Sequence, residues 1–523
     1  MIKEVDIEVE PSIGFDEEKF RTYVLNKLSL PDQPSIVVEM LRRSVDARGR
    51  QVKIVIKARI AVDELLPDQQ LKLNYQFVGN RPSVVVVGAG PAGLFAALRL
   101  IELGYKPIVL ERGKDVQTRR RDLAAINKDH IVNPESNYCF GEGGAGTYSD
   151  GKLYTRSKKR GDVNRILEIL VAHGAGREIL VDAHPHIGTN KLPKIVAALR
   201  SRITDCGGEV HFNTKVTDLI IDRGELLGVH IQNGDQIRGM GVILATGHSA
   251  RDIFYLLHNK NVRIEAKPFA MGVRIEHQQT LIDKIQYKCE DRGEFLPASS
   301  YSLVSQVDYK GVERGVFSFC MCPGGFIVPA ATAQEEVVVN GMSPSRRDSK
   351  FSNSGIVVAI NLEDLGDYHK YGVFAGLELQ KTIERNAWIA GGKTQKAPAQ
   401  RMLDFVNRKT SGTLPETSYQ PGLASVSMDE VLVPSIASRL REGFRLFGAK
   451  MRGYLTNDAQ IVGVESRTSS PVTIPRNKET LEHVEIKRLF PCGEGAGYAG
   501  GIVSAAIDGE KCAEAFARLY KGN

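Results

Sequence analysis

The chain has 523 residues, of which 42% are hydrophobic and 25% charged, as is usual for globular proteins of two to four domains. Its formal charge of +7, from 69 basic and 62 acidic side chains, is mild for this length and is a weak hint of an anionic ligand, which a dinucleotide would already satisfy. The seven cysteines are odd in number and include no CxxC pair, so neither a disulfide framework nor a zinc site is supported.

The start of the chain alternates charged and apolar residues, unlike the apolar core of a signal peptide. The longest apolar run is interrupted by Gly and Pro and contains Arg99, so we expect no membrane span. A reducing cytoplasm is the simplest setting for these features.

The first segment, residues 1–80, has the pattern of a separate α+β module. Residues 2–10 alternate as a strand, residues 16–28 have helical spacing, and residues 36–44 and 51–60 flank a turn as a hairpin. The segment holds 12 basic and 13 acidic residues, which is not the footprint of a nucleic-acid-binding module. A docking or oligomerisation role and a structural cap are the two alternatives.

The motif that organises the chain begins at Ser83. Residues 83–87 form a valine-rich strand, Gly88-Ala89-Gly90-Pro91-Ala92-Gly93 form a turn, and an apolar helix continues to Leu103. A second strand, 107–110, then ends on Glu111. The order of strand, turn, helix and strand predicts a βαβ unit.

Each glycine of this turn has a physical task. Gly88 makes the tight turn, Gly90 lets a pyrophosphate approach the backbone, and Gly93 lets the helix lie close to the sheet. The helix N-terminus offers free N–H groups to the phosphates, and Glu111 is placed to accept hydrogen bonds from an adenosine ribose. The turn predicts a dinucleotide site but does not separate FAD from NAD.

A glycine-rich loop follows at residues 137–153. Its glycines suit either a flexible linker or a place where backbone presses against a flat ligand, and its aromatic and hydroxyl residues favour the ligand. The basic run at residues 156–160 is interpreted as a solvated loop. His184 and His186 have no third ligand at useful spacing, so we interpret them as a loop beside the cofactor and predict no metal.

A run of short strands is expected at 209–222, 226–231 and 236–238, feeding a strand that ends on Ala245-Thr246-Gly247. A β-meander leading into such a strand end is a second signature of FAD domains. The final glycine there lets the chain turn beside the cofactor.

Residues 263–484 have few motifs and indicate a mixed, β-rich substrate or cap domain. Strands are expected at 271–276, 315–319 and 356–362, and helices at 371–387 and 434–447. Cys320 and Cys322 lie within it, but a CxC disulfide is strained, so a redox pair is poorly supported.

The last segment returns to dinucleotide chemistry. A strand ends on Cys492-Gly493-Glu494, a glycine-rich bend continues through Gly501-Ile502, and an apolar helix occupies 503–519. This second helix N-terminus is another site that favours an anion. In an FAD domain such a helix points at the flavin N1 and O2 region and stabilises negative charge on the reduced ring.

Together, these motifs resemble the glutathione-reductase-like FAD superfamily. The loop around Gly141, the Cys-Met-Cys-Pro-Gly-Gly stretch, the segment 466–471 and the bend 492–501 resemble a narrower group, the uncharacterised bacterial FAD-dependent dehydrogenases, along nearly the whole chain. The superfamily usually has Asp at the position of Glu494, so the contact of that side chain is open.

The resemblance implies a set of cofactor contacts. It places on the pyrophosphate Gly88, Gly90, Ala92 and Gly93, and on the adenosine ribose Glu111 and Arg112. It places on adenine Val216, and beside the isoalloxazine ring Gly144, Gly146 and Thr147. It places on the ribityl chain Glu494, and at the pyrimidine edge Gly501 and Ile502. The Thr246, Gly247 and Gly493 turns complete the predicted FAD site.

The expected fold is α/β with α+β parts: a Rossmann-like FAD-binding domain at 81–262 and 485–523, a β-rich domain inserted at 263–484, and the N-terminal module at 1–80. The chain has neither a redox CxxC nor a second complete GxGxxG. Any NAD(P)H would therefore bind transiently at the flavin face.

The leading functional hypothesis is an FAD-dependent oxidoreductase that moves a hydride between flavin N5 and a small organic substrate. His248, Arg467 and Tyr498 lie beside cofactor motifs and are the candidate proton donors or substrate anchors, with a structural role as the alternative for each. An FAD-using RNA-modification enzyme is a second hypothesis, against which the mild charge argues. A flavin-binding regulatory protein is a third.

Overall fold

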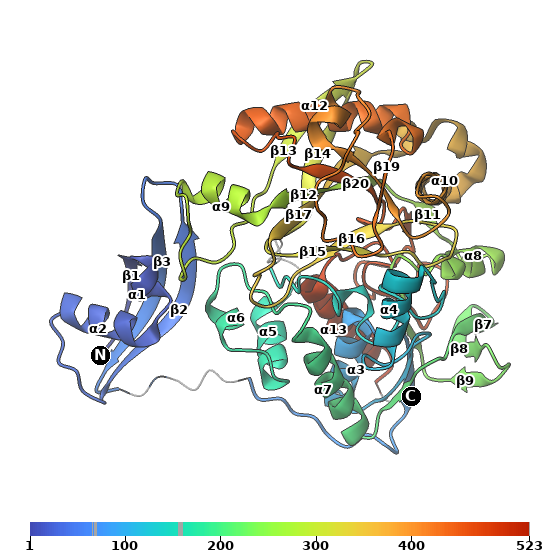
Figure 1. Cartoon of the computed structure of the whole chain (residues 1–523). Helices are drawn as coiled ribbons and strands as arrows, with labels where there is room; N and C mark the ends of the chain where they lie inside the picture. The colour runs from blue at the N-terminus through green and yellow to red at the C-terminus, as the bar shows by residue number, and fades with distance from the viewer. Residues whose placement is uncertain (65, 67–70, 155–160, 522–523) are drawn as a thin grey trace.

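A computed structural model describes residues 1–64, 66, 71–154 and 161–521. Figure 1 shows a small blue unit at the N-terminus, a lower body in which blue and red segments meet, and an upper body of yellow and orange segments. The basic run at 156–160, interpreted above as a solvated loop, lies outside the described residues.

The N-terminal unit is a three-stranded antiparallel sheet covered by two helices. Its elements are β1 (Ile2–Val9), β3 (Lys53–Val62) and β2 (Ile36–Asp46) in spatial order, with α1 (Pro11–Gly14) and α2 (Glu17–Lys27). Helix α2 begins where the Asp16 side chain accepts a hydrogen bond from the Lys19 N–H at 3.0 Å. Its Phe20 packs in one core with Ile54 and Ile56 of the sheet. The predicted strand, helix and hairpin are confirmed.

The lower body is built on a five-stranded parallel sheet. Its strands, in spatial order, are β22 (Leu489–Pro491), β10 (Val242–Leu244), β4 (Ser83–Val87), β5 (Lys106–Leu110) and β6 (Glu209–His211). The valines of β4 are buried because both faces of the sheet are covered. The predicted βαβ unit is confirmed, with helix α3 at Pro91–Glu102 between β4 and β5.

Helices cover one face of this sheet, and a small meander covers the other. The helical face is formed by α3, α13 (Ile502–Leu519), α7 (Leu192–Asp205) and α5 (Val163–Ala172). Helices α3 and α13 lie so close that a Cβ on Gly509 would be 2.0 Å from the carbonyl oxygen of Ala92. The two helices that begin beside the cavity described below are therefore held in one rigid pair.

The meander consists of β7 (Val216–Asp222), β8 (Glu225–Ile231) and β9 (Gln236–Arg238). The strand predicted from Glu209 to Asp222 is wrong as a single element, because β6 belongs to the parallel sheet and only β7 belongs to the meander. Asn213 between them has a left-handed φ of 51°, and the next N–H, of Thr214, donates to the Glu111 carbonyl oxygen at 2.9 Å. This turn ends β6 and redirects the chain.

The upper body is a seven-stranded sheet. In spatial order it contains β13 (Val304–Tyr309), β14 (Val312–Cys322), β17 (Phe351–Ile360), β12 (Phe269–Gln278), β20 (Gln460–Glu465), β18 (Ala397–Arg401) and β19 (Leu423–Ser425). Helices α10 (Ala375–Ala390) and α12 (Pro434–Lys450) contribute Ile383 and Phe444 to its core. The expected strands and helices of this region are present with shifted ends.

Shorter elements connect these layers. They are β11 (Glu265–Ala266) paired with β21 (Val472–Thr473), β15 (Phe326–Pro329) paired with β16 (Val339–Met342), α4 (Arg119–Asp129), α6 (Glu178–Val181), α8 (Arg251–Asn259), α9 (Gln279–Tyr287), α11 (Met402–Val406), η1 (Gly144–Gly146), η3 (Leu362–Phe374) and η4 (Met428–Glu430).

The fold is mixed α/β with a parallel sheet, as expected from the sequence. The division into an N-terminal module, a discontinuous FAD-binding domain and an inserted domain stays a prediction. Within the described ranges, no helix has both the length and the low polarity that crossing a bilayer would require.

Candidate functional site

A cavity of about 600 Å³ lies at the carboxyl ends of four strands of the parallel sheet. The residues that follow β4, β5, β10 and β22 all line it, together with the glycine-rich loop and the edge of the upper sheet. The carboxyl edge of a parallel sheet is where α/β proteins bind ligands. The sequence motifs, although far apart in the chain, therefore meet at one place.

The β4–α3 turn forms one wall of the cavity. Gly88 has a φ of 104°, and a Cβ there would lie 2.4 Å from the Ala245 carbonyl oxygen. A Cβ on Gly93 would lie 1.9 Å from the carbonyl oxygen of Gly88, so α3 can approach the turn only without a side chain there. A Cβ on Gly90, in contrast, would meet no protein atom within 4 Å. Gly90 therefore leaves open space beside the N-terminus of α3.

Fourteen of the sixteen predicted cofactor residues line this cavity. They are Gly88, Gly90, Ala92, Glu111, Arg112, Gly144, Gly146, Val216, Thr246, Gly247, Gly493, Glu494, Gly501 and Ile502. The other two, Gly93 and Thr147, lie behind the lining. The Thr147 side chain is buried and donates from Oγ1 to the Glu142 carbonyl oxygen at 2.9 Å, so it holds the glycine-rich loop together.

Glu111 organises three loops at once. Its Oε2 accepts a hydrogen bond from the Ala89 N–H, and its Oε1 accepts from the Gly113 and Gly141 N–H groups, all at 2.9 Å. The side chain is buried. Since each carboxylate oxygen has two lone pairs, Oε2 keeps capacity for a further donor. Glu111 thus ties the glycine-rich loop to the turn that follows β4.

Arg112 is held by carboxylates of two other segments. Its Nη1 and Nη2 donate to Asp252 at 2.9 and 2.8 Å, and its Nε donates to Glu135 at 2.7 Å. These bonds, with burial acting against them, raise the pKa of the Arg112 guanidinium. Its plane lies over the Phe140 ring, with 4.4 Å from Cζ to the ring centroid. Arg112 is a rigid part of the cavity wall.

The three candidate catalytic residues line the same cavity but differ in their partners. Nδ1 of His248 lies 3.4 Å from Oε2 of Glu494, so two residues predicted separately form a pair. The Tyr498 hydroxyl accepts from the Arg476 N–H at 2.9 Å and donates to the Ile474 carbonyl oxygen at 3.2 Å. The hydroxyl of Tyr498 therefore has structural partners.

Arg467 belongs to a buried ion network. Its guanidinium donates to Glu336 at 2.6 Å, to Glu384 at 3.1 Å and to the Thr332 hydroxyl at 2.9 Å. Arg251 donates to the other oxygen of Glu384 at 2.8 Å. Burial opposes ionisation of Glu384, but the two arginines hold its pKa below the ordinary value. Arg467 therefore fixes this wall of the cavity.

Several polar residues of the lining were not among the predicted site residues, and Lys152, Cys320 and Glu465 belong to them. Burial raises the pKa of Glu465 to about 7, while the neighbouring Arg274 opposes that rise. Glu465 directly precedes the segment 466–471, and Lys152 lies near the end of the glycine-rich loop. Lys152 and Glu465 face the same cavity because the lower and upper bodies are in contact. The local sequence around either residue does not reveal that contact.

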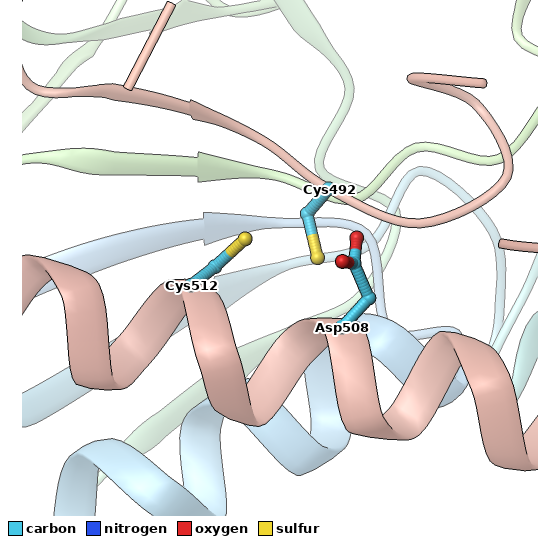
Figure 2. A group of neighbouring side chains, drawn as sticks. All are labelled: Cys492, Asp508 and Cys512. Carbon is cyan, nitrogen blue, oxygen red and sulfur yellow. The ribbon is translucent and has the colours of Figure 1, made fainter. Parts of the chain in front are cut away.

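Cys492, Asp508 and Cys512 form a buried group, shown in Figure 2, whose ligand atoms all lie within 4.8 Å of one another. Arg476 already supplies a positive charge here, donating from Nη2 and Nη1 to the two oxygens of Asp508 at 2.6 and 3.0 Å. Asp508 also accepts from the Gly493 N–H at 2.8 Å. The group anchors the bend that follows β22, and its carboxylate is neutralised without a metal ion.

The cavity fits a dinucleotide. Helices α3 and α13 both begin at its wall, so two sets of free N–H groups and two partial positive charges face one space. Gly90 and Gly247 would carry a Cβ into space free of protein atoms. The volume is that of a pocket for a large organic ligand.

Three family models match the chain. One described as "FAD-dependent protein, C-terminal domain-like" matches residues 268–468, a "FAD binding domain" matches residues 83–121, and a domain of unknown function matches residues 1–61. The FAD-binding match covers the β4–α3–β5 unit. This match supports FAD as the dinucleotide.

An "Uncharacterized protein" of Clostridium beijerinckii is 38% identical over 533 residues, covering 98% of this chain and 97% of that protein. A "Thiamine thiazole synthase" of Aeropyrum pernix is 28% identical over 186 residues, covering 32% of this chain and 56% of that protein. Among solved structures, a geranylgeranyl bacteriochlorophyll reductase-like protein of Thermoplasma acidophilum has a TM-score of 0.34 at 13% identity, covering 84% of this chain and 78% of that one.

Proposed function

This chain belongs to one family with its uncharacterised Clostridium beijerinckii relative, and we propose that it is an FAD-dependent oxidoreductase acting on a small organic substrate. The observation that carries the proposal is the meeting of four strand ends, two helix N-termini and the glycine-rich loop at one cavity. FAD bound there would accept or donate a hydride at N5.

The chain's own residues would divide the work of holding the cofactor. The turn at Gly88 and Gly90 and the N-terminus of α3 would face the pyrophosphate. Val216 would face the adenine, and Gly501 and Ile502 at the start of α13 would face the pyrimidine edge. These roles follow from the resemblance and from the positions of the residues around the cavity.

Two groups can hold or move protons in this cavity. Glu465, with a pKa raised to about 7 by burial, can gain or lose a proton on its carboxyl near neutral pH. His248 can carry a proton on Nδ1, which faces Glu494. We propose these two, and not Arg467 or Tyr498, as the proton-handling residues.

Replacing Tyr498 with phenylalanine is expected to lower the free energy of unfolding by about 1 kcal/mol, because the Arg476 N–H and the Ile474 carbonyl oxygen lose their partner. FAD content and the rate of flavin reduction should stay within about two-fold of the wild type. Urea unfolding and stopped-flow absorbance measure the two effects. A fall of roughly 100-fold in the reduction rate would instead identify Tyr498 as a proton donor.

NAD(P)H would reach the flavin from solvent as a transient partner. The described part of the chain contains one five-stranded parallel sheet, and the FAD motifs use its carboxyl edge. A small substrate would enter the same cavity along the wall made by the upper sheet. We infer docking or oligomerisation for the N-terminal module. We also infer a cytoplasmic location, which the seven free cysteines support.

Anaerobic stopped-flow spectroscopy tests the proposal. The purified protein should contain FAD, and NADH or NADPH should bleach its visible absorbance in a single turnover, after which candidate acceptors should restore it. Bleaching by one nicotinamide identifies a reductase, and bleaching by an organic donor alone identifies a dehydrogenase. A protein that binds no FAD, or whose FAD no donor reduces, would contradict the proposal.

A further inference from the structure

The edge of strand β14 that lines the cavity has an unusual backbone. Cys320 has a left-handed φ of 46°, and the pairing of β14 with β17 shifts register between Phe319 and Cys322. A non-glycine residue rarely adopts this conformation, and such strain gathers at functional positions. Cys320 lines the cavity, whereas the Cys322 side chain lies fully buried behind it.

Two cations from different parts of the chain hold this turn. Nη2 of Arg274, in β12, donates to the Cys320 carbonyl oxygen at 2.6 Å and lies 3.5 Å from Sγ of Cys322. Nζ of Lys152, at the end of the glycine-rich loop, donates to the Met321 carbonyl oxygen and lies 4.0 Å from Sγ of Cys322. Positive charge thus surrounds the turn from the lower and the upper body.

The cysteines share this environment unequally. A hydrogen bond from the Cys322 thiol, together with Lys152 and Arg274, lowers the pKa of Cys320 well below its ordinary value, although burial opposes the change. The same hydrogen bond and burial raise the pKa of Cys322. The Cys322 thiol, the inner of the two, also donates to the Cys320 carbonyl oxygen at 3.3 Å, so its proton is held within the turn.

Two carboxylates share this environment, Glu465 and Asp150, and Oδ2 of Asp150 lies 3.7 Å from Nζ of Lys152. Asp150 is paired with Arg347, whose Nη2 donates at 2.6 Å and Nε at 3.1 Å. Glu465 is paired with Arg274. The Cys322 donor, Lys152 and Arg274 together lower the pKa of Cys320, while burial and Asp150 oppose them.

We propose that Cys320 is a nucleophilic thiolate of the flavin cavity, which attacks soft electrophilic carbon centres placed there, with Lys152 and Cys322 as its positioning residues. The sulfur forms the new S–C bond with its lone pair, and the leaving group departs with the electrons of the bond that breaks. The inference deepens the proposed oxidoreductase function and rests on it for the substrate. The reactivity of the sulfur does not depend on bound FAD.

Alkylation by iodoacetamide tests this on the purified full chain, with its flavin and after flavin removal. The S–C bond forms and iodide leaves, and peptide mass spectrometry assigns the rate to each cysteine. Between pH 8 and pH 6 the rate at an ordinary thiol falls by roughly 100-fold, whereas the rate at Cys320 should fall less than about five-fold. Cys289, a half-buried free cysteine beside the N-terminal unit, is the internal control.

Variants show whether Lys152 and Cys322 cause the reactivity of Cys320 or only maintain the fold around it. Lys152→Met and Cys322→Ala should each restore a steep pH dependence at Cys320 while leaving that of Cys289 unchanged. Cys320→Ser should remove the pH-independent component of the total rate, and Cys289→Ser should keep it. A steep pH dependence at Cys320 in the wild type, or no modification of Cys320 at either pH, would overturn the proposal. Absence of flavin from the purified protein would instead count against the oxidoreductase function alone.

Discussion

Replacing Gly90 with leucine is expected to weaken FAD binding by roughly 100-fold or more, equivalent to about 3 kcal/mol, while the cofactor-free protein keeps its stability. A Cβ at Gly90 would meet no protein atom within 4 Å, and the backbone there has an ordinary φ of −75°. The new side chain would therefore fill the cavity at the N-terminus of α3 without disturbing the fold. Titration of the apoprotein with FAD and thermal unfolding of the apoprotein measure the two effects.

Gly93→Ala is the matched control, three residues along the same motif. A methyl group there would lie 1.9 Å from the Gly88 carbonyl oxygen, so α3 must move away from the turn. This variant should lose stability even without FAD, by about 3 kcal/mol. An FAD-loaded Gly90→Leu variant with wild-type affinity would show that the cofactor lies elsewhere.

Replacing Glu111 with alanine is expected to lower the free energy of unfolding of the apoprotein by roughly 4 kcal/mol or more. The change leaves three buried N–H groups, of Ala89, Gly113 and Gly141, without their acceptor. Each bond to a charged acceptor contributes about 1.5–3 kcal/mol, and a buried donor without a partner adds its own penalty. Urea unfolding of the apoprotein, followed by circular dichroism, gives the value.

Glu111→Gln separates two roles of this side chain. The amide keeps one oxygen acceptor but turns an NH₂ group toward at least one N–H, so we expect about half of the loss seen with alanine. If Glu111 served only the adenosine ribose, both variants would lose FAD affinity and neither would lose apoprotein stability. That result would refute the role in joining the loops.

Local signals were enough to predict the part of the fold nearest the cofactor. The valine run, the glycine turn and the apolar helix from Ser83 to Leu103 follow one another in sequence, so a short stretch of residues is enough to predict how they are arranged. The meander was predicted for the same reason, except where the turn at Asn213 sends β6 into a different sheet. Pattern alone does not reveal which sheet a three-residue strand joins.

The upper sheet could not be ordered from sequence. Strand β12 pairs with β17 on one side and with β20 on the other, and these partners come from distant segments. The same limit applied to the site. Arg467 was predicted to lie beside a cofactor motif, but its carboxylate partners Glu336 and Glu384 come from distant parts of the chain. Without knowing these two partners, one could not infer that the Arg467 guanidinium is paired.

The pairing of β22 with β10, and of α13 with α3, has a consequence for biosynthesis. The wall that contains Gly493 and Gly501 leaves the ribosome only after the whole upper sheet has been made, although the turn at Gly90 emerges early. The carboxyl edge of the early βαβ unit therefore stays uncovered until α13 packs against α3. Cofactor capture is then a late step in the maturation of the chain, and a nascent chain that stops before Leu489 has no closed chamber in which to keep it.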